Sequence, residues 1–106
     1  MPNLFLAYAY PDREFAARVK SALDQKGFEV WDWFAGLPDS AWGRIFPAID
    51  SSVAFVFIIT NQAVVSRACL QELDYAVQQD KRIFLLHREE VPTEGPIRSL
   101  RPQARW

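Results

Sequence analysis

Four short apolar segments alternate along the chain with amphipathic segments, and this alternation is the main structural signal in the sequence. The apolar segments are 4–9, 28–31, 53–59 and 83–86, and the third of them (VAFVFII) is the longest unbroken run. Runs that are apolar at consecutive positions are typical of strands buried on both faces of a parallel sheet. We therefore expect four parallel strands, with 53–59 at the centre.

The segments between these strands show helical spacing and helix-end signals. Asp12 precedes apolar residues at helical spacing and is predicted to be an N-cap, and Gly27 is predicted to end that helix in a left-handed conformation. A second helix is expected over about 41–50, although Pro47 should end it early or kink it. A third helix is expected over about 66–79, capped by the serine at its start. The resulting β-α-β order implies right-handed crossovers.

The ends of the predicted strands define where a ligand would bind. A doubly wound sheet binds ligands beyond the carboxyl ends of its strands, so the loops 9–12, 32–40 and 60–65 should share one edge. The sequence contains neither a glycine-rich phosphate loop nor a nucleophile elbow. Cys69 and His87 are the only residues of their types, which excludes an internal disulfide and a Cys/His zinc cluster. We expect His87 to be a partly buried structural residue.

Length and charge narrow the functional class further. A chain of 106 residues is long enough for one domain only, and a hydrophobic share of 50% is typical of a soluble globular domain. Twelve Lys and Arg residues against 13 Asp and Glu residues leave a net charge of -1, so no basic field attracts nucleic acid or a membrane surface. No apolar run approaches the roughly 20 residues of a membrane span, and the N-terminus lacks the basic region of a secretory signal. We therefore expect a cytoplasmic protein.

Glu72 stands out among the carboxylates of the third predicted helix. Its helical neighbours three and four residues away are small or apolar: Ala68, Cys69, Tyr75 and Ala76. Such surroundings would raise the pKa of the carboxyl group, whereas the nearby helix N-terminus would oppose this effect. From the residues alone, the expected position of Glu72 is on the solvated surface, and a functional carboxylate is the alternative.

Several short motifs occur in an order and spacing that together are specific. They are FLAYAYPDREF at 5–15, GFEVW at 27–31, LP at 37–38, VFIIT at 56–60, SRACLQELDYA at 66–76 and KRI at 81–83. The block from 66 to 76 resembles the pattern S-x-x-C-x-x-E-L-x-x-A, and the first block resembles a strand followed by a polar turn and D-x-x-F. In this order the motifs resemble a TIR (Toll/interleukin-1 receptor) domain of the bacterial type.

The resemblance implies an α/β fold, a flavodoxin-like three-layer sandwich with a parallel sheet of order 2-1-3-4-5. In the family a fifth strand and a last helix would follow Trp106, so we expect a C-terminally truncated domain. The chain (1–106) is thus interpreted as a single TIR domain, the N-terminal effector part of a longer protein. The implied partners are other TIR domains, in a homo-oligomer or filament, and a sensor or oligomerising domain of the parent protein.

The resemblance also implies an activity. Many TIR domains in immune and antiphage defence cleave NAD+ at the nicotinamide–ribose bond after self-assembly, by hydrolysis or cyclisation. In those enzymes the glutamate of the S-x-x-C-x-x-E motif is catalytic, which corresponds to Glu72. We expect Tyr10, Asp32, Trp33 and Phe34 to line the substrate site, with NAD+ as substrate, no cofactor and no metal. Nicotinamide in NAD+ is already a cationic leaving group, and one anion near the ribose can stabilise an oxocarbenium-like transition state.

Two other interpretations remain open. Ala7, Ala9 and Ala68 stand where the family has polar or aromatic residues, which favours a TIR domain that acts only as a scaffold through TIR–TIR contacts. A small nucleoside-processing enzyme of a related α/β type would also use a carboxylate on ribose. Such an enzyme would act on free nucleosides without assembly, which distinguishes it from an assembly-dependent NAD+-cleaving enzyme.

Overall fold

Four parallel strands form one sheet in the computed structural model, which describes residues 3–32 and 42–88. The strands are β1 (Asn3–Ala7), β2 (Glu29–Asp32), β3 (Ala54–Ile59) and β4 (Arg82–His87). Their order is β2-β1-β3-β4, and each neighbouring pair is parallel. The predicted strand order is confirmed. All six residues of β3 are buried, as expected for a central strand, and the strand begins one residue later than predicted.

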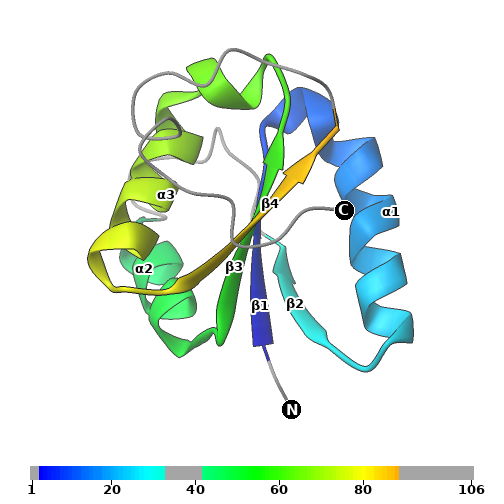
Figure 1. The fold of residues 1–106 in the computed structure, drawn as a ribbon, viewed down its shortest axis with the longest axis horizontal. Coiled ribbons are helices and arrows are strands. Elements are labelled where there is room, and N and C mark those ends of the chain that lie inside the picture. Colours follow the sequence, from blue (N-terminus) through cyan, green and yellow to red (C-terminus); the bar gives the residue numbers. More distant parts are fainter. Residues whose placement is uncertain (1–2, 33–41, 89–106) are drawn as a thin grey trace.

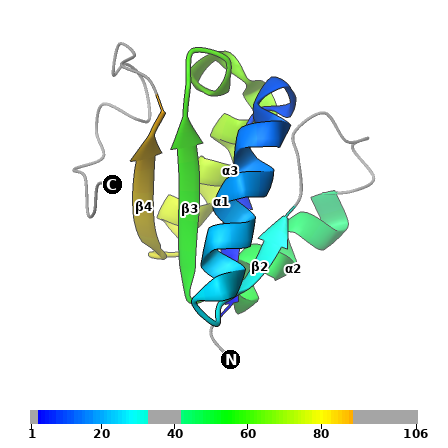
Figure 2. The same ribbon diagram turned by 90° about the vertical axis from the view of Figure 1, so that its right-hand side faces the viewer.

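Within these residues, three α-helices pack on the two faces of the sheet (Figures 1 and 2). They are α1 (Arg13–Gln25), α2 (Trp42–Ser51) and α3 (Arg67–Gln78), with two short 3-10 turns, η1 (Tyr10–Asp12) and η3 (Ala63–Val65). Helix α1 lies on one side of the sheet, and α2 and α3 lie on the other (Figure 1). The architecture is therefore the predicted three-layer α/β sandwich.

Alternation of side chains along the strands divides the core between the two faces. The larger cluster lies toward α2 and α3 and includes Phe5, Ala7, Phe55, Phe57, Ile59, Ile83 and Leu85. The second lies toward α1 and includes Leu6, Tyr8, Ala16, Val56, Ile58 and Leu86. Within the larger cluster the ring of Phe5 stacks on that of Phe55, with 5.4 Å between centroids. Near-complete burial on both faces explains why the strands are apolar at consecutive positions.

Two helices end in the same backbone motif. After α1, the amide of Gly27 donates to the carbonyl of Asp24 and the amide of Phe28 donates to that of Leu23, which is a Schellman motif. The motif needs a left-handed residue, and Gly27 has a φ of 90°, so its predicted role is confirmed. After α3 the corresponding residue is Asp80, with a φ of 57°. An aspartate is strained there, since left-handed backbone costs an L-residue free energy.

The helix predicted over about 41–50 is confirmed, and of the two effects predicted for Pro47, an early end does not occur. The helix runs from Trp42 to Ser51 with Pro47 inside it. Apolar residues on both sides of the proline, Ile45, Ala48 and Ile49, are buried in the core. Packing of this face offsets the roughly 3 kcal/mol that an interior proline costs.

The end of α2 is held by residues of and after α3. The Lys81 Nζ donates to the backbone oxygens of Asp50, at 2.6 Å, and Ser52, at 3.0 Å. The hydroxyl of Tyr75 donates to the Asp50 carboxylate, with oxygen separations of 2.8 and 2.9 Å. A cation on the last carbonyls of a helix satisfies groups that have no partner within the helix. These contacts therefore fix α2 against α3.

Candidate functional site

The carboxyl ends of β1, β3 and β4 meet at one edge of the sheet, where Asp12, Thr60 and Arg88 form a hydrogen-bonded cluster. The Thr60 hydroxyl donates to Asp12 Oδ2 at 2.5 Å and accepts from the amide of Ala63 at 3.1 Å. Arg88 Nη1 donates to Asp12 Oδ1 at 3.4 Å. The predicted meeting of the loops 9–12 and 60–65 is thus confirmed, whereas most of the loop 32–40 lies outside the described residues.

Asp12 is the residue before α1, but its side chain makes no capping hydrogen bond. The predicted N-cap role is wrong because the carboxylate is buried and turned toward a hydroxyl and a guanidinium, which are the stronger donors. The Arg88 guanidinium also lies 4.7 Å from the centroid of the Phe15 ring. Both oxygens of Asp12 have donors, so the cluster is a structural connection among three strand ends. No local sequence pattern indicates this cluster, although the strand order places these strand ends side by side.

Helix α3 positions Glu72 on its buried face. The hydroxyl oxygen of Ser66 accepts from the amide of Cys69 at 3.3 Å, which confirms the predicted cap and fixes the start of the helix. The buried side chains are Cys69, Glu72, Leu73 and Ala76, which lie three or four residues apart. Glu72 is only 1% exposed, so the expectation of a solvated position is wrong.

The carboxyl group of Glu72 has no hydrogen-bond partner among residues 3–32 and 42–88. Both of its oxygens are buried, and no hydrogen bond reaches either one within the described part of the chain. Burial raises the pKa of Glu72 well above its ordinary value of 4.5, the direction that its apolar neighbours predicted. A buried carboxyl group that lacks hydrogen-bond donors is stabilised by any ligand that donates hydrogen bonds from hydroxyl groups or carries a positive charge.

Cys69 lies one helical turn before Glu72 and is an unreactive thiol. Burial raises its pKa to about 12, the charge of Glu72 adds to this effect, and the hydrogen bond with Ser66 opposes it. A thiol with this pKa carries almost no thiolate at neutral pH, and the thiolate is the nucleophile. Of the groups on this face of α3, Glu72 is therefore the one able to act on a ligand.

The other predicted site residues are placed only in part. Tyr10 lies in η1 at the same carboxyl edge, 48% exposed, with the Arg13 guanidinium 4.2 Å from its ring centroid. Asp32 is the last residue of β2, where only its backbone is described. Trp33 and Phe34 lie outside the described residues. Tyr10 and Asp32 thus lie at strand ends on this edge, and α3, which carries Glu72, follows β3 from the same edge.

Alanines fill the β1 part of the core that faces α3. Ala7 and Ala9 are buried in the same apolar cluster as Leu73, and the partly buried Ala68 packs against it. These methyl groups bring no hydrogen-bond donor to the buried face of α3. His87 is partly buried, as predicted, and its Nε2 has no partner within residues 3–32 and 42–88.

Two kinds of site are absent from the described ranges. No three His, Cys, Asp or Glu side chains lie close enough there to hold a metal ion. Nor does any of these helices have the length and apolar character needed to cross a membrane.

Solved structures similar to this chain include TIR domains and a CMP N-glycosidase. The TIR domain of the Toll-related receptor TRR-2 from Hydra magnipapillata aligns with a TM-score of 0.79 at 16% identity, covering 97% of this chain and 82% of that one. The CMP N-glycosidase BcmB of Clostridium botulinum aligns with a TM-score of 0.71 at 25% identity, covering 91% and 77%. The TIR domains of the activated Roq1 resistosome, which recognises the pathogen effector XopQ, align with a TM-score of 0.65 at 20% identity, covering 82% and 57%.

Sequence comparison identifies the family. No curated protein matches the chain. The family model described as "TIR domain", however, matches residues 4–105, which is nearly the whole sequence. The strand order and helix placement agree with this match, and the Hydra TIR domain shares the fold over almost all of the chain. The chain therefore belongs to the TIR domain family.

Proposed function

We propose that this TIR domain cleaves the bond between nicotinamide and ribose in NAD+, with Glu72 as the catalytic carboxylate. The observation that carries the proposal is the buried carboxyl group of Glu72, which has no hydrogen-bond partner within the described residues. Burial of an unpaired carboxyl lowers the stability of a folded protein. Ionisable side chains that lower the stability of the protein and have a strongly shifted pKa are concentrated at functional sites.

The proposed reaction needs no proton donor. The bond between the anomeric carbon and the nicotinamide nitrogen breaks, and both electrons go to the nitrogen, so nicotinamide leaves as a neutral base. The ribose becomes oxocarbenium-like and is stabilised by the ionised Glu72, which accepts hydrogen bonds from the sugar hydroxyls. Water then adds to the anomeric carbon and loses a proton, giving ADP-ribose. Attack by a group of the same molecule would give a cyclic product instead.

In this proposal, self-assembly of TIR domains is what makes Glu72 accessible to the substrate. In a single chain the side chain is 1% exposed, so a substrate reaches it only after its surroundings rearrange. We propose that contacts with other TIR domains produce this rearrangement. Tyr10, Asp32, Trp33 and Phe34 would then line the site. The biological setting of the proposal is a cytoplasmic immune or antiphage effector within a longer protein that supplies the sensor.

A second candidate is an N-glycosidase that acts on free nucleotides or nucleosides. Similarity to BcmB favours it, since that protein is a CMP N-glycosidase and shares 25% identity over 91% of this chain. The same carboxylate would serve, because the bond broken is again between an anomeric carbon and a base nitrogen. This candidate predicts turnover by the monomer. The third candidate, a scaffold without chemistry, is favoured by the buried Ala7 and Ala9, which bring no polar group to the site.

The test is release of the base from several substrates under matched conditions. NAD+, CMP and cytidine are incubated with the clustered and the monomeric chain, and products are separated by chromatography. The variants are Glu72→Gln and, as a control on the exposed side of the same helix, Asp74→Asn. We expect nicotinamide release by the clustered chain and by Asp74→Asn, and none by Glu72→Gln. Release of cytosine by the monomer would support the second candidate, and no release from any substrate would support the scaffold.

A further inference from the structure

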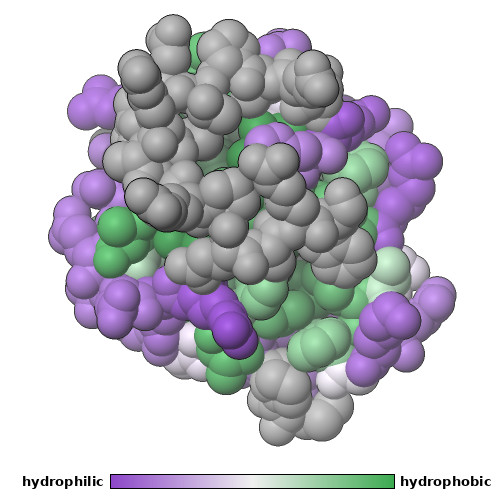
Figure 3. All heavy atoms as spheres, viewed as in Figure 1, coloured by the Kyte–Doolittle hydropathy of each residue, from purple (hydrophilic) through white to green (hydrophobic). Residues whose placement is uncertain are grey.

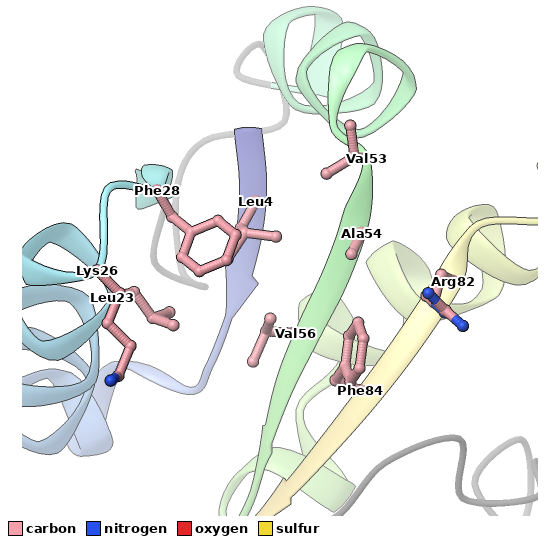
Figure 4. Close-up of a pocket in the computed structure, with 9 residues that line it drawn as sticks. All are labelled: Leu4, Leu23, Lys26, Phe28, Val53, Ala54, Val56, Arg82 and Phe84. Carbon is pink, nitrogen blue, oxygen red and sulfur yellow. The ribbon is translucent and has the colours of Figure 1, made fainter. Parts of the chain in front are cut away.

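Ionisable side chains are placed differently on the two faces of the sheet. On the α1 face, Lys26 and Arg82 line an apolar groove, and both residues are exposed (Figure 4). The space-filling view shows hydrophilic side chains at the surface around hydrophobic ones (Figure 3). On the opposite face, Glu72 lies on the buried side of α3 with both carboxyl oxygens enclosed. An ionisable group is therefore enclosed on the α3 face, where no described residue pairs with it.

The segment that leads into α3 makes weak contacts with the core. This α3 entry segment (residues 63–72) comprises η3 and the first turns of α3 and includes Glu72. Its core contacts include the methyl groups of Ala63 and Ala68, which pack in the same cluster as Ala7 and Ala9. Methyl groups bury little apolar area, so separating them from one another costs little free energy. Val65 of this segment is 76% exposed and contributes almost nothing to the packing.

The second half of α3 is held more firmly than the entry segment. The Tyr75 hydroxyl donates to the Asp50 carboxylate, with oxygen separations of 2.8 and 2.9 Å. The rings of Phe46 and Tyr75 stack with 4.2 Å between their centroids, and Leu73 is fully buried. Segments with few large apolar contacts open at low free energy while the rest of a protein stays folded. An opening of the entry segment can therefore stop before Leu73.

Hydration of Glu72 decides whether its carboxyl group is ionised. Burial raises the pKa of this group, so the closed chain favours the neutral acid. Cys69, the titratable neighbour one turn earlier, has a pKa of about 12 and stays neutral. The strands β1 and β3 and the turn η3 carry no titratable side chain. Among the described side chains, the titratable groups on the other elements around α3 are Asp12 of η1, Asp50 of α2 and His87 of β4. An opening that admits water removes the cause of the raised pKa.

We propose that the α3 entry segment opens locally while the sheet stays folded, and that each opening releases one proton from Glu72. The O–H bond of the carboxyl group breaks, its electron pair stays on the carboxylate, and water or buffer accepts the proton. Rising pH therefore favours the open state, by up to about tenfold for each pH unit above the ordinary pKa of 4.5. The opening that admits a substrate would also supply the ionised carboxylate for cleavage. The inference rests on the proposed function for this consequence alone.

Cys69 reports the opening, because it is the only cysteine and is buried on the same face of the entry segment as Glu72. Dithiodipyridine labels the full chain between about pH 5 and 7.5, below the ordinary thiol pKa of 9.0. The labelling rate is divided by that of the urea-unfolded chain at each pH, which gives the equilibrium constant for opening. We expect this constant to rise by up to about tenfold per pH unit in the parent and in the control Asp74→Asn. It should not change with pH in Glu72→Gln.

Low concentrations of urea separate local opening from unfolding of the whole chain. A local opening exposes little surface, so its equilibrium constant should stay nearly constant as urea is added. Labelling that rises with urea in parallel with global unfolding would overturn the proposal. So would a constant that does not change with pH in the parent, or equal pH dependence in the parent and Glu72→Gln. None of these readouts uses a substrate, so a chain that opens as expected but releases no nicotinamide would contradict the proposed function and leave this inference intact.

Discussion

Replacing Glu72 with glutamine should stabilise the protein at neutral pH and leave its stability unchanged in acid. Glutamine keeps the size and shape of the side chain and removes its charge. In the native state both Glu72 oxygens are buried with no partner in the described part of the structure, so nothing there offsets the loss of hydration when the group ionises. In the unfolded chain the same group is hydrated and ionises at its ordinary pKa.

The magnitude follows from the raised pKa. Because the folded pKa of Glu72 lies well above the ordinary 4.5, the native state binds more protons than the unfolded state between these two values. The free energy of unfolding therefore falls as pH rises through this range, by about 1.4 kcal/mol for each pH unit. Below pH 4.5 both states are protonated and this loss is absent. Glutamine does not titrate, so the free energy of unfolding of the variant lacks this decrease with pH.

The assay is urea unfolding of the parent and Glu72→Gln at several pH values from 4 to 8. The difference between the two free energies of unfolding isolates Glu72, because all other groups titrate in both proteins. We expect the difference to be near zero at pH 4 and to grow in favour of the variant as pH rises. Asp74→Asn, at an exposed position of the same helix, should show no such trend. A variant less stable than the parent at pH 7 would refute the reasoning, since it would mean that the carboxylate is paired and structural.

Three further predictions test contacts elsewhere in the fold by urea unfolding. Lys81→Met removes the donor to two carbonyls at the end of α2 and should cost about 1–2 kcal/mol. Lys26→Met should cost little, because Lys26 ends α1 through its backbone amide and its side chain makes no hydrogen bond with the described residues. Thr60→Val leaves a buried carboxylate oxygen of Asp12 without its hydroxyl donor and should cost about 1–3 kcal/mol, while Thr60→Ser should retain most of the stability. Asp80→Gly relieves a left-handed backbone and should stabilise by up to about 1 kcal/mol; destabilisation would mean that the aspartate side chain contributes more than its backbone strain costs.

The sheet could be predicted because its signals are local. Each strand is a short apolar run, each helix has apolar residues at helical spacing, and Gly27 is a residue type that a Schellman motif requires. The order of the motifs resembles that of TIR domains, and this resemblance predicted the order of the strands in the sheet. Only the strand ends differed, by one or two residues.

The errors concern side chains whose environment depends on distant residues. Asp12 has the position of an N-cap, but its bond partner Thr60 lies 48 residues later in the sequence. The helix around Pro47 was predicted to continue past the proline or to end at it, and burial of the residues around it against the sheet explains why it continues. Glutamate is normally exposed, and only tertiary packing shows that Glu72 lies on the buried face of α3.

Burial of Glu72 bears directly on the catalytic role that the family resemblance implies for this residue. A surface glutamate in a family motif could be retained for solubility or a salt bridge. An unpaired buried carboxyl lowers stability and has no structural partner within the described residues, so its presence calls for a functional reason. The proposals of NAD+ cleavage, nucleotide cleavage and scaffolding therefore differ in which substrate, if any, reaches Glu72.

The most direct measurement of the central claim is nicotinamide release from NAD+ as a function of protein concentration. Parent and Glu72→Gln are compared, and light scattering in the same tube reports assembly. We expect release by the parent to begin at the concentration where assemblies form, and no release by the variant although it assembles equally. Nicotinamide release by Glu72→Gln at the parental rate, or assembled parent that releases none, would contradict the account.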